Sequence, residues 1–275
     1  MILNRRRLLC VAATSAFGAD APPEIMDTHV HFYDPERPGG VPWPSPTEKV
    51  LYRPAMPSDY QSLSKARVII VEASKLFSDN QWILDLAAKN PFVGGCVGNL
   101  DPSDTAFAQN VAEFRKNLKF LGIRLGTNRA QEHFDKLKPL EDASLSLDLI
   151  GNAEMYPLAA RLSDRYPKLR MILDHLPLAK PDASIRELLG RRNVYAKVSW
   201  ILRGPDDKLE NHLEALDEVW SVFGENRVVY GSNWPVSDLV VPYSKIQETA
   251  IAYFRRKPLK KYLIENSRAI YRWGR

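Results

Sequence analysis

Three histidines have the spacing from which a metal site could be built. His29 and His31 lie two residues apart in Met-Asp-Thr-His-Val-His-Phe, and His175 lies much later, in Leu-Asp-His-Leu-Pro. Alternate side chains of a β-strand share one face, so Asp27, His29 and His31 are expected to point the same way. Three imidazoles that meet at one place could hold one divalent metal ion, and zinc suits such a set. The alternative is that these histidines only satisfy hydrogen bonds in the core.

Further charged side chains stand where strands are expected to end. Glu72 could act as a general base or as the partner of a histidine, or it could form a salt bridge to a loop. Arg124 has glycines on either side of it on the same strand face. This leaves room for its cation to reach a carboxylate or carbonyl of a substrate. Lys197 is expected either to contact substrate or to pair with Asp148 or Glu72.

The remaining candidates have structural alternatives. Trp234 and Trp43 could stack on a flat ring or a sugar face, although tryptophan is more often used for packing. The other residues are expected to be structural: Asp101 in a turn, Cys96 in the core, and His133 and His212 at the surface.

Short β-branched runs recur along the chain and must position these residues. Eight of them are expected as strands: Glu24–Thr28, Arg67–Ala73, Phe92–Leu100, Phe120–Leu125, Leu145–Ile150, Arg170–Asp174, Val194–Ser199 and Arg227–Gly231. Helices are expected between and after them: Gln81–Lys89, Thr105–Asn117, Ala153–Tyr166, Ile185–Leu189, Leu209–Phe223, Tyr243–Phe254 and Leu259–Asn266. Regular alternation of strand and helix selects a parallel sheet, and this length predicts one α/β domain, a (β/α)₈ TIM barrel, over residues 22–275.

A doubly wound open sheet is the rival architecture. It would normally carry a Gly-rich phosphate turn after its first strand, where this chain has Asp-Thr-His-Val-His. In the barrel, His175 follows Met171 and Leu173 on one strand face and is expected to meet the other two histidines at the mouth. The longest irregular stretch, residues 34–60, holds seven prolines and follows the first strand directly. Long ordered loops at that end of a barrel usually carry function.

The composition excludes several classes of protein. The 275 residues are 45% hydrophobic and 26% charged, which rules out disorder, collagen and small disulfide scaffolds. No apolar run approaches the roughly 18 residues of a membrane span. The net charge of +5 falls to 35 basic against 33 acidic residues without residues 1–19, so nucleic acid is not an expected partner. Only Cys10 and Cys96 occur, and no disulfide framework follows.

The N-terminus has the order of a signal peptide. Arg5, Arg6 and Arg7 precede an apolar stretch and a zone of small residues, and residues 1–21 are therefore expected to be removed. An arginine pair followed by x-Leu-Leu resembles a twin-arginine export signal. The prediction is a periplasmic or secreted protein, and the alternative is a cytoplasmic protein with a basic tail.

Three motifs together resemble one known family. Ile-Met-Asp-Thr-His-Val-His-Phe, Leu-Asp-His-Leu-Pro and Val-Val-Tyr-Gly-Ser-Asn-Trp-Pro-Val are similar to the first, sixth and eighth strand motifs of the amidohydrolase-related (amidohydrolase 2) family. The most similar members are the sugar lactonases and pyrone-dicarboxylate lactonases. The resemblance implies a TIM-barrel metal-dependent hydrolase with its active site at the carboxyl ends of the strands.

One position departs from that family pattern. The family commonly has Asp where this chain has Asn233, and that Asp binds the metal and accepts the proton of the attacking water. Asn233 can coordinate through oxygen or orient a water molecule, but it cannot act as a base. Asp238, five residues later, could supply the missing carboxylate.

The resulting hypothesis is a hydrolase that opens a small polar lactone with water activated by one divalent ion. His29, His31 and His175 would hold the ion, the ion and Arg124 would stabilise the oxyanion, and Glu72 or another carboxylate at the mouth would accept the proton. Two alternatives remain open: a metal-dependent decarboxylase of an acidic ring, and a non-catalytic ligand-binding barrel. The oligomeric state is left open.

Overall fold

The computed structural model describes residues 24–274, and the expected signal peptide lies outside them. Eight parallel strands form one sheet in which each strand pairs with the next in sequence. Their bounds are β1 Met26–Val30, β2 Arg67–Val71, β3 Val93–Gly98, β4 Phe120–Gly126, β5 Ser146–Ile150, β6 Arg170–Leu176, β7 Val194–Val198 and β8 Val228–Tyr230. This order is the one predicted for a TIM barrel.

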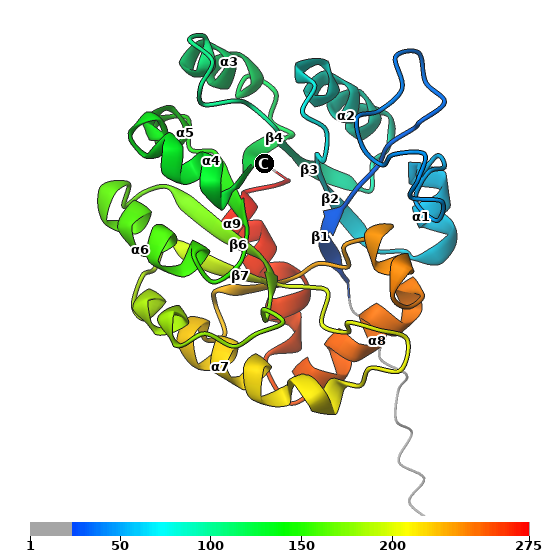
Figure 1. The fold of residues 1–275 in the computed structure, drawn as a ribbon, viewed down its shortest axis with the longest axis vertical. Helices are drawn as coiled ribbons and strands as arrows, with labels where there is room; N and C mark the ends of the chain where they lie inside the picture. Colours follow the sequence, from blue (N-terminus) through cyan, green and yellow to red (C-terminus); the bar gives the residue numbers. More distant parts are fainter. Residues whose placement is uncertain (1–23, 275) are drawn as a thin grey trace, which may run out of the picture.

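Helices follow the strands and surround them (Figure 1). Their bounds are α1 Pro57–Leu63, α2 Phe77–Lys89, α3 Phe107–Phe114, α4 Thr127–Glu132, α5 Lys138–Asp142, α6 Met155–Arg165, α7 Leu213–Phe223, α8 Tyr243–Phe254 and α9 Asn266–Tyr271. Shorter turns are 3₁₀-helical at Phe134–Lys136, Ala183–Leu188, Leu209–His212 and Val236–Leu239, and π-helical at Lys261–Glu265. Within the described residues, no helix is long and apolar enough to cross a membrane.

The barrel closes just beyond the end of β8. The backbone of Trp234 lies parallel to Val30 of β1. His31 N donates to the Trp234 carbonyl at 2.8 Å, and Asn233 N donates to the His29 carbonyl at 2.9 Å. These bonds join the segment that follows β8 to the histidines of β1.

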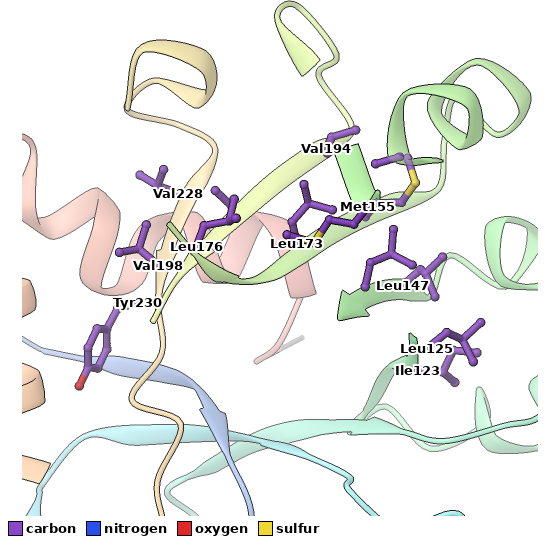
Figure 2. Packing of buried hydrophobic residues seen from close by; sticks show 14 of the residues in the cluster. Ile123, Leu125, Leu147, Met155, Leu173, Leu176, Val194, Val198, Val228 and Tyr230 are labelled. Atoms are coloured by element: carbon purple, nitrogen blue, oxygen red, sulfur yellow. The ribbon is translucent and has the colours of Figure 1, made fainter. Parts of the chain in front are cut away.

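The buried apolar side chains form two main layers. The outer core fills the space between strands and helices, and Figure 2 shows part of it, where Leu173 of β6 lies near Met155 of α6. The inner core fills the barrel and includes Ile69, Ile172 and Val229 from three different strands. Bulky β-branched residues are what the interior of a TIM barrel usually holds.

The C-terminal segment closes the amino end of the barrel. Ile270, Tyr271 and Trp273 pack into the inner core, and Figure 1 shows α9 in red across the centre of the ring. Arg170, the first residue of β6, donates from Nε to the Ile270 carbonyl at 2.6 Å. The carboxyl ends of the strands therefore form the mouth.

The elements differ from the expected ones mainly at their ends. β1 is shifted two residues later than predicted, and β6 runs two residues further. Helices α1, α4 and α5 were not expected, and the region predicted as a helix over Ile185–Leu189 is a 3₁₀ turn. The terminal helix runs on to Tyr271 beyond its predicted end at Asn266, because the apolar residues that cover the barrel floor lie there.

Candidate metal centre

The structure brings the three predicted histidines together at the mouth. The ring centroid of His29 lies 4.5 Å from that of His175 and 4.9 Å from that of His31. Burial lowers the pKa of His31 to about 3 and that of His175 to about 4, and it lowers the pKa of His29 well below 6.5. All three imidazoles are therefore neutral at pH 7, which is the form that binds metal.

Each imidazole has one nitrogen engaged by the protein. His31 Nδ1 donates to the Val71 carbonyl at 2.6 Å, because a carbonyl oxygen can only accept. His175 Nδ1 lies 2.9 Å from Ser199 Oγ. His29 Nδ1 lies 3.3 Å from Lys197 Nζ, whereas His29 Nε2 is buried and has no hydrogen-bond partner among the described residues. A buried ring nitrogen without a partner, beside two other neutral imidazoles, fits a metal ligand.

Asp174 completes this cluster, and the sequence reasoning missed it. One ligand atom each from His29, Asp174 and His175 lies within 4.8 Å of the others, so these groups could hold one ion. His31 lies outside that tightest group, although its ring contacts that of His29. The signal that could have pointed to Asp174 is its position directly before His175 in a strand that ends at the mouth.

The floor beneath His29 is charged. Lys197 Nζ is fully buried and lies 2.6 Å from Asp148 Oδ2, 2.9 Å from Asp174 Oδ1 and 3.3 Å from His29 Nδ1. Burial raises the pKa of Asp148 to about 6, whereas Lys197 holds the pKa of Asp174 well below its usual range. Two carboxylates thus share one ammonium at neutral pH. The extra negative charge favours a bound cation.

Strand alternation was wrong for two residues of this region. Met171 and Leu173 lie in the outer core rather than on the face of His175. The register shifts between Leu173 and Leu176, and His175 has a positive φ of 63°, so both Asp174 and His175 reach the site. A second register shift lies between Asp27 and Val30 of β1. The Asp27 carboxylate accepts from Tyr60 Oη of α1 at 2.9 Å and from Ser232 N at 2.8 Å.

The charge of Arg124 acts on His31, on His175 and on Glu72. Glu72 directly follows Val71, whose carbonyl holds His31, and its Oε2 is buried without a partner among the described residues. Burial raises the pKa of Glu72 to about 7, a value suited to a general base at neutral pH. Arg124 Nη2 donates to the Glu72 carbonyl at 2.9 Å.

We expect Glu72→Gln to stabilise the protein increasingly as the pH rises. The pKa of Glu72 is raised from 4.5 to about 7 in the folded chain, so stability is present below pH 4.5 and lost as the pH rises through 7. Gln keeps the neutral form at every pH. The free energy of unfolding of the variant relative to the wild type, measured in urea, should therefore increase by about 3 kcal/mol between pH 4.5 and pH 8. A difference that does not change with pH would contradict the expectation.

A cavity of about 360 Å³ opens beside Arg124 at the mouth. The segments that follow β2, β3 and β4 line it with polar side chains: Lys75, Asn99, Asp101, Asp104, Asn110 and Arg129. None of the three histidines lines this cavity. Arg124 is shared, because it lines the cavity and its charge also acts on His31 and His175. The volume suits a small ligand.

The other proposed site residues have different surroundings. Lys197 is fully buried and forms the pair with Asp148 that was one of its two expected roles, so it has no surface open to substrate. Trp234 is also fully buried, against Phe32 and Tyr60, and this position favours packing. Asn233 is buried three residues after the end of β8, and its backbone N–H donates to the His29 carbonyl.

The Pro-rich stretch reaches the histidines through Trp43, whose ring centroid lies 5.9 Å from that of His31. On the other side of the mouth, Trp200 has its ring centroid 5.8 Å from that of His175. The guanidinium carbon of Arg203 lies 5.5 Å from the centroid of the Trp200 ring. Trp200 Nε1 and Arg203 Nε are both buried without a partner in the described part of the chain. Sequence reasoning missed both residues, since neither lies within a predicted strand.

The residues expected to be structural lie outside the cluster of metal-ligand candidates. Cys96 is a free, fully buried thiol. Asp101 accepts from Ser103 N in a turn and also binds Arg129. His212 pairs with Asp207 at 2.6 Å, and Asp238 with Arg53 at 3.6 Å. His133 was expected at the surface but is buried, and its Nε2 lies 3.6 Å from Glu132 without a hydrogen-bond partner among the described residues. Asp238 therefore has a cation of its own.

Comparisons with known proteins agree with this fold. The family described as Amidohydrolase matches residues 26–273. An L-fucono-1,5-lactonase of Burkholderia ambifaria is 32% identical over 238 residues, which cover 78% of this chain and 81% of the relative. A Burkholderia multivorans amidohydrolase crystallised with bound Zn has a TM-score of 0.80 at 22% identity, over 91% of this chain and 100% of that one. A Pseudomonas putida structure described as a putative 2-pyrone-4,6-dicarboxylic acid hydrolase has a TM-score of 0.72 at 21% identity, over 91% of this chain and 98% of that one.

Proposed function

This chain belongs to the amidohydrolase family and is a hydrolase. We propose that it opens the ring of a small, hydroxyl-rich lactone and that its site holds one divalent ion, zinc. The observation that carries the proposal is the meeting of three neutral imidazoles at the mouth, with His29 Nε2 buried and unpartnered among the described residues. His29, His31 and His175 would hold the ion, together with Asp174. The Zn-bound structural relative has the same fold.

Three side chains near the proposed metal site would have distinct roles in lactone hydrolysis. When bound, the ion supplies a Lewis acid and lowers the pKa of water. Glu72, with a pKa of about 7 and a free Oε2, would accept the proton of the attacking water and return it to the ring oxygen that leaves. Arg124 would donate to the carbonyl oxygen as negative charge develops there. Asn233, joined to His29 through its backbone, would orient the water.

The cavity beside Arg124 supports a polar substrate. It offers a cationic donor from Lys75 and a carboxylate acceptor from Asp104, while Arg129 and Asp101 pair with each other in its wall. Neighbouring donors and acceptors suit the hydroxyl groups of a sugar acid better than an apolar ester. An L-fucono-1,5-lactonase among the relatives points to the same class.

We further propose that the protein acts outside the cytoplasm. The support is the order of residues 1–21, with three arginines, an apolar stretch and small residues. Export in a folded state would suit a protein that acquires its metal before transport.

The test is acid release from a panel of five- and six-membered aldonolactones that includes L-fucono-1,5-lactone, followed with a pH indicator. Zinc-loaded protein should accelerate hydrolysis above the spontaneous rate, and the His29→Ala/His175→Ala variant should not. Release of CO₂ from acidic ring compounds without lactone hydrolysis would favour the decarboxylase. A thermal shift with lactones and no turnover would identify a binding barrel.

We expect Arg124→Met to lower kcat/KM more than Arg129→Met does. Loss of a charge-assisted hydrogen bond of about 1.5–3 kcal/mol corresponds to a decrease in kcat/KM of about 10- to 100-fold. The matched control is Arg129→Met, because Arg129 lines the same cavity but is paired with Asp101. Steady-state kinetics on the best lactone of the panel provide the measurement. Equal losses in the two variants would contradict a specific role for Arg124.

A further inference from the structure

A chain of buried polar contacts links the proposed metal centre to the C-terminal helix. Tyr271 Oη of α9 donates to Asp148 Oδ2 at 2.7 Å. The same carboxylate oxygen accepts from Lys197 Nζ at 2.6 Å, and Lys197 Nζ continues to Asp174 Oδ1 and His29 Nδ1 at 2.9 and 3.3 Å. All five side chains are at most 1% exposed. The contacts run from the floor of the barrel to the histidines at its mouth.

The helix that carries Tyr271 is itself firmly held. Its residues Ile270 and Tyr271 belong to the inner core, together with Trp273 just beyond the helix. The Ile270 carbonyl accepts from Arg170 Nε, and the guanidinium carbon of Arg67 lies 4.9 Å from the centroid of the Trp273 ring. The packing of α9 therefore fixes the direction from which the Tyr271 hydroxyl enters the barrel interior.

Asp148 depends on this hydroxyl for its orientation. Its Oδ2 receives both of the donors that the structure provides, whereas Oδ1 is buried without a partner among the described residues. Without the hydroxyl, Lys197 would be the single group that fixes the carboxylate. Rotation of Asp148 would then move the ammonium relative to His29 and Asp174, since partners of metal-binding side chains orient those side chains.

We infer that Tyr271 is a positioning residue of the active site: its hydroxyl fixes Asp148, which sets Lys197 beneath His29 and Asp174. The inference rests on the proposed metal site and extends it to the last helix, 123 residues from Asp148 along the chain. A purely structural role would be the alternative, because Tyr271 also fills the inner core.

The experiment compares Tyr271→Phe, which removes only the hydroxyl, with Tyr166→Phe as a matched control. Tyr166 is also buried, and its hydroxyl donates to the Phe134 carbonyl at 2.8 Å, outside the barrel interior. Three quantities are measured on each full-length protein: zinc affinity by competition with a chromophoric chelator, kcat and KM for the best lactone, and the melting temperature. The first does not depend on turnover.

Tyr271→Phe should weaken zinc binding by about tenfold and lower kcat by a similar factor, with KM within about twofold of the wild type. Tyr166→Phe should lower the melting temperature alone. Combining Tyr271→Phe with Asp148→Asn should add less to the loss of zinc affinity than the two single effects predict, because both act through one carboxylate.

Zinc affinity and kcat of Tyr271→Phe that match those of Tyr166→Phe would overturn the inference and leave the proposed function intact. A wild type that binds zinc but opens no lactone would instead overturn the proposed function, and the zinc affinities would still decide the role of Tyr271. A wild type that binds no zinc would overturn both.

Discussion

The His29→Ala/His175→Ala variant should lose its divalent ion and essentially all of its hydrolytic activity. These two residues come from different strands, β1 and β6, and with Asp174 they form a cluster whose ligand atoms lie within 4.8 Å of one another. Elemental mass spectrometry should find about one ion per wild-type chain and little in the variant. Because an ion contributes several kcal/mol to catalysis, the rate should fall by about a thousandfold or more.

The control for this experiment is His133→Ala/His212→Ala, which also removes two imidazoles. His133 lies next to Glu132 and His212 next to Asp207, and neither belongs to the cluster at the mouth. This control should keep its ion and its activity. A wild-type protein that is free of metal and cannot be reconstituted would contradict the metal site, and equal metal content in the two double variants would do the same.

The Lys197→Met variant should be about 3–5 kcal/mol less stable than the wild type. Met fills a similar volume but leaves Asp148 and Asp174 buried without the ammonium that they share. Breaking a buried ion pair by removing one partner is strongly destabilising, because the remaining charge has no compensation. Urea unfolding at pH 7 measures the loss of free energy.

Lys119→Met is the control: the Lys119 side chain is partly buried, whereas that of Lys197 is fully buried, and among the described residues Lys119 binds the backbone carbonyls of Ala87 and Val93. Loss of such hydrogen bonds should cost about 1 kcal/mol. If Lys197→Met lowered the free energy of unfolding no more than Lys119→Met, another cation would have to compensate the charges of Asp148 and Asp174. In that event the charged floor would not depend on Lys197.

The barrel could be predicted because its signal is local. Runs such as Val68 to Val71 are apolar over a strand length, and the alternation with helical stretches is regular. Residues at the strand ends, among them His29, His31 and Glu72, could be chosen because the carboxyl ends of barrel strands form the mouth. Closure between β1 and the segment after β8 followed from the strand count.

Departures from regular geometry could not be predicted in the same way. The positive φ of His175 and the register shift beside it bring Asp174 into the site, and alternation placed that residue on the opposite face from His175. The roles of Trp200 and Tyr271 depend on tertiary packing, which no local pattern records. The sequence left two roles open for Lys197, contact with substrate or pairing with a carboxylate. Its full burial between Asp148 and Asp174 favours the pairing.

The closure of the barrel also has a kinetic consequence. Thr28 Oγ1 donates to the Tyr230 carbonyl across 202 residues of sequence, and the Asp27 carboxylate accepts from Ser232 N across 205. Contacts of such long range form slowly, because the loop that they close must first be ordered. Since Asn233 is bonded to His29 by the same closure, we expect the histidines to reach their final positions late in folding. A metal ion that binds only this arrangement would therefore shift the equilibrium toward the completed barrel by mass action.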